Sequence, residues 1–294
     1  MERVRVLVVG QGHMGGLHAR KLRARPDVDV DVQDPPLGLL PGQQRPDLAI
    51  IACPTSLHLA EARPLLDLGV RCLVEKPLAA TVAEARLLAD YPHCAVGHIE
   101  RFNPVLDAVR GVRPRFLEAE RLSPWRAPTA GARGTDVDVI ADLMVHDLDL
   151  VRLFLPGRVR EVRASGVGVR SSGAADIVNA RIEVEAADGS IGVAVLTASR
   201  VSREPTRKLR LIEPGVYWSL DLQRRTALRV RWGEGELEGE AIPVAADSGD
   251  PLDREHDALL AWARDGGVNP LPATEGLEAL ALAEQVRAAV AAMG

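Results

Sequence analysis

The sequence predicts an α/β protein: a first domain on a helix-covered parallel sheet, then a second α/β domain on an open, mostly antiparallel (mixed) sheet. In the first third of the chain, short apolar runs alternate with helical stretches, which is typical of right-handed crossovers between parallel strands. After about residue 118, strand-like runs follow one another with few helices between them. The 294 residues are 47% hydrophobic and suffice for two domains, which we expect at 1–118 and 119–294.

The strands expected in the first domain are short, apolar and rich in β-branched residues, and several end near glycine or proline. Helical stretches lie at 57–69 and 81–91, between the later strands. The expected strands are residues 3–10, 28–34, 47–54, 71–77 and 93–98.

The second domain has a different order of elements. A strand-like run at 115–122 leads into a loop rich in arginine, proline and glycine, and then into a helix over 141–150. Several strand-like runs follow between residues 160 and 232. The helical stretches 253–266 and 274–294 close the chain.

Charge and composition exclude some classes of function. A formal net charge of −5 argues against a nucleic-acid-binding protein, which normally has a basic surface. No apolar run reaches bilayer length and the start does not resemble a signal peptide, so we expect a cytoplasmic protein with no membrane partner. The cysteines Cys53, Cys72 and Cys94 fit reduced, buried thiols better than a disulfide framework or a zinc site.

A glycine-rich turn follows the first expected strand. Gly10, Gly12 and Gly15 have the spacing G-x-G-x-x-G, and the turn runs through His13 and Met14 into a helix. Such a turn lets backbone approach a pyrophosphate, whose charge suits the free N–H groups of the helix N-terminus. The alternative is a plain structural turn. We favour a Rossmann domain that binds a dinucleotide.

Asp34 ends the second expected strand, where a carboxylate accepts hydrogen bonds from the ribose hydroxyls of a dinucleotide. It would repel a 2′-phosphate, and the next basic residue along the chain is Arg45. We therefore expect NAD as cofactor, with NADP less favoured. The alternative is that Asp34 only begins the turn at Pro35 and Pro36.

Several stretches together resemble the Gfo/Idh/MocA family of oxidoreductases. They are GQGHMGGLH (10–18), CPTSLH (53–58), LVEKPLA (73–79) and DLMVHDLDL (142–150). The resemblance implies a Rossmann domain and an open mixed sheet that commonly mediates homodimers or homotetramers. It also implies hydride transfer between NAD(P) and a hydroxyl group of a small molecule, usually a sugar or polyol.

The same resemblance assigns roles to individual residues. Lys76 matches the active-site lysine, and Asp142 and His146 match the catalytic acid and imidazole. The residues that it places at the cofactor, in addition to the glycine turn, are Cys53, Pro54, Thr55, His58, Glu75 and Lys76.

The residues themselves suggest a division of labour. Asp142 and His146 are four apart in an apolar stretch, so a regular helix would put both on one face. Imidazole titrates near neutrality, which favours His146 as the base that removes a hydroxyl proton. Lys76 would then bind the hydroxyl and Asp142 would orient the substrate or the imidazole, although the roles of His146 and Lys76 could be reversed. A core histidine and a helix salt bridge are the alternatives. The spacing of Asp138, Asp142 and His146 fits no usual metal site, and we expect no metal.

The substrate prediction depends on two further stretches, 96–104 and 122–147, which resemble a bacterial subgroup that oxidises the 3-hydroxyl of UDP-N-acetylglucosamine. Arg121, Arg126 and Arg133 would lie in one loop, where a guanidinium suits a diphosphate, unless the loop is only solvated. Arg101 and Asn103 could reach the substrate, or Arg101 could hold the domains together. Another sugar or polyol as substrate, or a noncatalytic protein that senses NAD or a nucleotide sugar, remain as alternatives.

Overall fold

The computed structural model describes residues 3–37, 45–125, 138–170, 174–232, 237–245 and 248–292. The chain forms two compact units, Met1–Phe102 with Pro251–Leu280, and Asn103–Asp250 with Ala281–Gly294. Residues 251–280 thus group with the first unit, whereas the sequence-based division at residue 118 put them in the second domain. The domain boundary at residue 118 stays a prediction.

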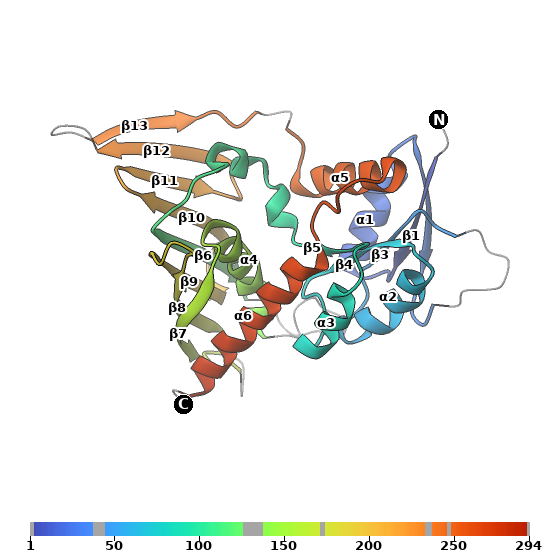
Figure 1. Ribbon diagram of the computed structural model, residues 1–294, viewed down its shortest axis with the longest axis horizontal. Helices are drawn as coiled ribbons and strands as arrows, with labels where there is room; N and C mark the ends of the chain where they lie inside the picture. Colours follow the sequence, from blue (N-terminus) through green and yellow to red (C-terminus); the bar gives the residue numbers. More distant parts are fainter. Residues whose placement is uncertain are drawn as a thin grey trace. The chain divides into compact units, whose positions relative to one another are not determined.

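The first unit contains a parallel sheet with the order β2-β1-β3-β4-β5 (Figure 1). Each strand falls inside one of the expected runs, so the parallel sheet is confirmed. The strands are β1 (Val4–Val9), β2 (Val28–Gln33), β3 (Leu48–Ile51), β4 (Arg71–Glu75) and β5 (Cys94–Gly97).

Helices cover both faces of this sheet because its strands carry apolar side chains on both faces. Figure 1 shows α1 and α5 on one side of the strands and α2 and α3 on the other. A capping box at Thr81 and Glu84 begins α3. The bounds are α1 (His13–Arg23), α2 (His58–Asp67), α3 (Val82–Ala89), α5 (Pro251–Asp265) and α6 (Ala273–Ala291), with the short 3₁₀ turns η1 (Thr55–Leu57) and η2 (Ile99–Phe102).

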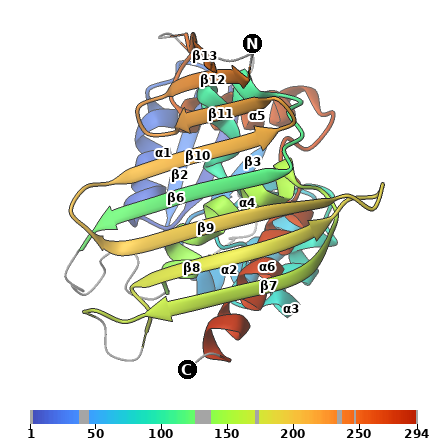
Figure 2. The same ribbon diagram turned by 90° about the vertical axis from the view of Figure 1, so that its left-hand side faces the viewer.

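The second unit contains a mixed sheet with the order β13-β12-β11-β10-β6-β9-β8-β7 (Figure 2). Its neighbours are antiparallel except β6 and β9, which are parallel. The expected open, mostly antiparallel sheet is confirmed. The strands are β6 (Phe116–Pro124), β7 (Arg158–Val167), β8 (Ile177–Glu185), β9 (Ile191–Ser202), β10 (Thr206–Glu213), β11 (Val216–Asp221), β12 (Thr226–Trp232) and β13 (Leu237–Ile242).

One face of the mixed sheet is the core of the second unit. Alternate residues of β8 and β9 are buried there against α4 (Val145–Phe154), η3 (Pro104–Val109) and residues 282–286 of α6. The intervening residues of the same strands are only half-buried. Figure 2 shows this second face toward the viewer with no helix of the described chain in front of it. This alternation leaves a broad sheet face available for other contacts.

Candidate active site

The three glycines of the first turn have different surroundings. Gly10 has a φ of +106°, and a Cβ added to it would lie 2.7 Å from the Ala52 carbonyl oxygen. A Cβ on Gly15 would lie 1.9 Å from the Gly10 carbonyl oxygen. The turn therefore requires glycine at both positions. A Cβ on Gly12, by contrast, would meet no described atom within 4 Å.

The open space at Gly12 lies at the start of α1. Gly12 is the residue before the helix, and no side chain of the described residues caps its first turn. The N–H groups near His13 and Met14 therefore lack a side-chain acceptor at this end, and an anion is favoured there by the helix dipole. These residues fit the pyrophosphate of a dinucleotide.

Asp34 lies beside this turn. The backbone N–H of Gln11 donates to Asp34 Oδ1 at 2.9 Å, and the side-chain amide of Gln11 donates to Oδ2, also at 2.9 Å. Asp34 is exposed, so its carboxylate can accept further hydrogen bonds. The structure thus brings Asp34 and the turn together, as the dinucleotide interpretation requires.

The segment after β3 joins the loop after β4 through His58. This ring is 1% exposed, with Nε2 3.1 Å from the Cys53 carbonyl oxygen and Nδ1 3.1 Å from that of Pro77. Burial lowers the pKa of His58, although these carbonyl groups favour its protonated form. Because the ring is enclosed, its visible role is to hold two loops together. Of its neighbours, Pro54 is exposed and Thr55 half-buried.

Cysteine packing follows the sequence interpretation with one difference. All three cysteines are free thiols; Cys72 and Cys94 are buried, whereas Cys53 is half-buried. Burial raises the pKa of the Cys53 thiol to about 11, so the thiol is protonated at neutral pH. The side chain can therefore line a cofactor site only as a neutral group.

Glu75 is the last residue of β4 and Lys76 follows it. Glu75 belongs to a network that the sequence did not predict. His18 Nε2 lies 2.9 Å from Glu75 Oε1, and His18 Nδ1 lies 2.8 Å from His256 Nε2. Burial alone would raise the pKa of Glu75, but the hydrogen bond from His18 and the charge of Lys76 lower it overall. Lys76 itself is half-buried. A sequence signal existed for His18, which falls on the same α1 face as the buried Gly15 and Leu22.

Asp142 and His146 lie where a regular helix was expected, but the helix begins differently. Residues Ile140–Met144 form a π-helical turn, η4, and α4 begins only at Val145. The regular α-helix expected over 141–150 is therefore wrong for its first turn, and a shared face for Asp142 and His146 stays a prediction, because a π turn is wider than an α turn. Asp142 is half-buried and His146 is 8% exposed.

Arg121 corrects a further expectation. Arg121 lies in β6 and not in the arginine-rich loop, and its Nη2 is 2.8 Å from Asp147 Oδ1. Both side chains are buried, so this guanidinium faces a carboxylate of the chain. Asp149 is buried as well, and Arg152 donates to the Gly157 carbonyl oxygen.

The other substrate candidates lie in separate settings. Arg101 forms an ion pair with Glu275 at 2.9 Å inside the first unit. Asn103 is buried in the second unit, where its amide donates to the Leu222 carbonyl oxygen at 2.9 Å and its Oδ1 accepts from the Val105 N–H. Substrate contact by either residue stays a prediction. Arg126 and Arg133 lie outside the described residues.

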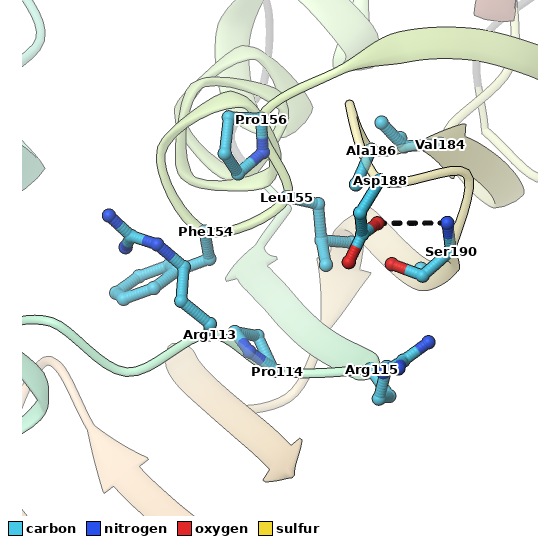
Figure 3. A pocket seen from close by; sticks show the side chains of 11 residues that line it. Arg113, Pro114, Arg115, Phe154, Leu155, Pro156, Val184, Ala186, Asp188 and Ser190 are labelled. Carbon is cyan, nitrogen blue, oxygen red and sulfur yellow. Dashed lines mark hydrogen bonds between the residues drawn. The ribbon is translucent and has the colours of Figure 1, made fainter.

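A surface pocket of about 240 Å³ lies elsewhere in the second unit (Figure 3). It is bordered by Phe154 and Leu155 at the end of α4, by Arg115 before β6, and by Asp188 and Ser190 in the turn between β8 and β9. None of the predicted site residues lines it. The described residues contain no cluster of three or more metal-ligating side chains and no helix long and apolar enough to cross a membrane.

Comparison with known proteins identifies the family. Residues 30–92 match the model for an oxidoreductase family with an NAD-binding Rossmann fold, and residues 106–212 match the GFO/IDH/MocA C-terminal domain. The UDP-N-acetylglucosamine 3-dehydrogenase of Acidithiobacillus ferrooxidans is 35% identical in an alignment of 334 positions, gaps included, which covers 99% of each chain. The inositol 2-dehydrogenase of Corynebacterium glutamicum is 30% identical over 125 residues, 40% of this chain and 37% of that protein.

Solved structures agree with these sequence relationships. A structure of the Acidithiobacillus ferrooxidans enzyme matches with a TM-score of 0.86 at 33% identity and covers 99% of each chain. A myo-inositol dehydrogenase from Corynebacterium glutamicum has the same fold, with a TM-score of 0.76 at 19% identity over 99% of this chain and 97% of that one. The resemblance inferred from the four sequence motifs is thereby confirmed, and the chain belongs to the Gfo/Idh/MocA family of oxidoreductases.

Proposed function

We propose that this oxidoreductase converts the 3-hydroxyl of a UDP-N-acetylhexosamine, such as UDP-N-acetylglucosamine, to a ketone. The observation that carries the proposal is the 35% identity along 99% of the chain with a UDP-N-acetylglucosamine 3-dehydrogenase. A free sugar or polyol is the second candidate, favoured by the inositol dehydrogenase, which however matches only 40% of this chain.

We propose NAD as the cofactor in preference to NADP. Asp34, held at the glycine turn by Gln11, supports this choice because a carboxylate binds ribose hydroxyls and repels a 2′-phosphate. The open backbone at Gly12 supports a pyrophosphate at the start of α1. Cys53, Pro54 and Thr55 are proposed to line the nicotinamide, whereas His58 would support it from behind.

The proposed chemistry removes a proton from the hydroxyl while a hydride leaves the same carbon. A bound nicotinamide would accept the hydride. His146 would take the hydroxyl proton on its imidazole, since its ordinary pKa lies near neutrality. The Lys76 ammonium would stabilise the negative charge that develops on the oxygen, and Asp142 would orient the substrate. Lys76 as base is the alternative assignment.

Further contacts to the nucleotide sugar are proposed for Arg126, Arg101 and Asn103. A guanidinium at Arg126 would pair with diphosphate oxygens. The ion pair of Arg101 with Glu275 and the hydrogen bonds of Asn103 hold these side chains in fixed orientations, which suits selective contacts.

We also propose that the protein forms a homodimer or homotetramer and acts in the cytoplasm. The face of the mixed sheet that no helix of the described residues covers supports the first proposal, because Ile191, Val193 and Val195 of β9 are only half-buried there. The free thiols Cys72 and Cys94 fit a reducing compartment.

One assay tests the function. Purified protein is mixed with NAD or NADP and with a panel of UDP-sugars, free sugars and polyols, and nicotinamide absorbance is followed. We expect reduction of NAD with UDP-N-acetylglucosamine. Turnover with free polyols alone would transfer the proposal to the second candidate. Binding of NAD and of UDP-sugars with no turnover would instead indicate a noncatalytic sensor.

A further inference from the structure

Four ionisable side chains are buried together in the first unit, and the proposed chemistry has no use for three of them. His18, Glu75, Glu255 and His256 are 0%, 6%, 1% and 1% exposed. They come from α1, from the end of β4 and from α5. Burying such groups costs free energy that apolar residues of similar size would not, so the arrangement calls for an explanation.

Hydrogen bonds connect Glu75, His18 and His256 in a row. Glu75 as a carboxylate can only accept, so His18 donates through Nε2. His18 Nδ1 lies 2.8 Å from His256 Nε2, so one ring donates this hydrogen bond to the other.

The cluster ends at the backbone of Lys76. Glu75 Oε2 accepts the Lys76 backbone N–H at 3.1 Å, while its Oε1 accepts from His18. Gly97 of β5 leaves just enough room, because an added Cβ would lie 3.2 Å from Glu75 Cδ. The carboxylate is therefore bound on one side to the helix that begins at the glycine turn and on the other to the lysine loop.

We propose that His18 is a positioning residue for the reaction: acting through Glu75, it fixes the backbone of Lys76 relative to the cofactor helix α1, and His256 fixes His18. The inference rests on the proposed function, since it assigns the support of the proposed active-site lysine. Helix α1 presents its N-terminus to the cofactor and its buried face to Glu75, so the network ties cofactor position to lysine position.

Several charged or ionisable groups near Glu75 influence its pKa. His18 and Lys76 favour its charged form. His58 also interacts with the Glu75 charge, as does Glu255. Burial raises the pKa of Glu255 well above its ordinary value, and the negative charge of Glu75 adds to the shift. The surroundings therefore favour the protonated form at Glu255 and the carboxylate form at Glu75.

Substitutions of His18 separate positioning from packing. In His18→Leu both hydrogen bonds are lost, whereas in His18→Gln the amide can still donate to Glu75 from about the place of Nε2. His93→Gln is the matched control, because His93 lies in the same unit, where its Nε2 is 2.9 Å from the Leu66 carbonyl oxygen and its ring packs edge-on against Tyr91. We expect His18→Leu to lower kcat by roughly 10- to 100-fold, which is the loss typical when a residue that orients an active-site group through a hydrogen bond is removed.

Two results would identify a positioning role for His18: recovery of kcat in His18→Gln, and a loss of kcat that is not matched by a loss of NAD affinity. His18→Gln should recover most of the lost kcat, and the affinity for NAD should change much less than kcat in both variants. His93→Gln should lower only thermal stability. Equal losses of kcat in His18→Leu and His18→Gln, or losses that simply follow the melting temperature, would overturn the proposal.

Hydrogen exchange gives a readout that needs no substrate. The backbone amide of Lys76 should exchange faster in His18→Leu than in the wild type, at the wild-type rate in His93→Gln, and near it in His18→Gln. Unchanged exchange at Lys76 in His18→Leu would refute the positioning role whatever the substrate. The same exchange pattern in a protein that oxidises only polyols would refute the proposed substrate and leave the positioning role intact. If His18→Leu does not fold, Glu75→Gln replaces it, because its single amide oxygen cannot accept both from His18 and from the Lys76 N–H at the places of the two carboxylate oxygens.

Discussion

Arg121 and Asp147 form a buried ion pair that joins β6 to α4. Arg121 Nη2 lies 2.8 Å from Asp147 Oδ1, and Nε lies 3.0 Å from Asp147 Oδ2. Their side chains are 4% and 3% exposed. Asp147 directly follows His146, so the pair fixes the first turn of α4 where the proposed base emerges.

Breaking this pair should destabilise the protein strongly. Asp147→Leu leaves a buried guanidinium without its carboxylate, and we expect a loss of roughly 3–5 kcal/mol in the free energy of unfolding. The double variant Arg121→Met with Asp147→Leu should recover much of that loss. Glu161→Gln is the control, because its exposed pair with Arg163 should contribute less than about 1 kcal/mol. Urea unfolding measures all of them, and a small loss for Asp147→Leu would contradict the expectation.

Asp34→Ala should weaken NAD much more than NADP. A hydrogen bond to a charged group contributes about 1.5–3 kcal/mol, which corresponds to roughly a tenfold or greater loss of NAD affinity. Gln11→Ala is the control for disturbance of the turn, since it removes the 2.9 Å side-chain bond to Asp34 and keeps the carboxylate. Binding titrations with both cofactors decide the matter. Equal weakening of NAD and NADP by Asp34→Ala would return Asp34 to a purely structural role.

His146→Asn should retain the fold and NAD binding but lower kcat by about 10²- to 10⁴-fold, as expected for a lost general base. Lys76→Met should cause a similar loss. The double variant should lose less than the product of the two, because groups that act on one step are not additive. Single-turnover kinetics and melting curves provide the test. A stable His146→Asn protein with near-normal turnover would make Lys76 the candidate base.

Arg126→Ala should raise KM for the UDP-sugar and leave NAD affinity unchanged, since it would remove a contact to the diphosphate that is made equally in the ground state and the transition state. Arg160→Ala, at an exposed position of β7, serves as the comparison. Steady-state kinetics with UDP-N-acetylglucosamine distinguish the two. An unchanged KM would favour a merely solvated arginine.

Glu255→Gln should stabilise the protein increasingly as pH rises. Burial raises the pKa of Glu255 in the folded state, so its contribution to stability is complete below about 4.5, the ordinary pKa of a glutamate, and is lost as pH rises through the folded value. The neutral amide avoids this loss. We expect a higher melting temperature than the wild type at pH 9, by about 2–4 °C per kcal/mol. Glu238→Gln, an exposed carboxyl in β13, should show no such trend, and parallel pH profiles for wild type and Glu255→Gln would count against the assignment.

Much of the fold could be predicted because local patterns and tertiary structure agree. Short β-branched runs became β1 to β5, and the capped stretch at Thr81 became α3. The π turn at Ile140–Met144 could not be foreseen, because its composition also suits an α-helix and the difference lies in backbone hydrogen bonding alone.

The candidate site was predictable only where a motif carries it. The glycine turn and Asp34 follow from spacing along the chain, and the structure brings them together through Gln11. The partners His18 and His256 are 238 positions apart, and nothing local indicates that they meet. Arg121 was misplaced for a related reason: its charge suggested a loop, whereas Asp147 compensates that charge in the core.

Because α5 belongs to the first unit, a gene fragment that encodes only the N-terminal part of the chain lacks part of that unit's core. Leu259, Leu260 and Trp262 complete the apolar cluster that packs on β1 and β3, and His256 completes the cluster beneath Glu75. A fragment truncated at residue 118 would expose that side of the sheet and should aggregate. A separate cofactor-binding unit should instead join residues 1–102 to residues 251–280 through a short linker. This fusion restores the helix that covers β1 and β3.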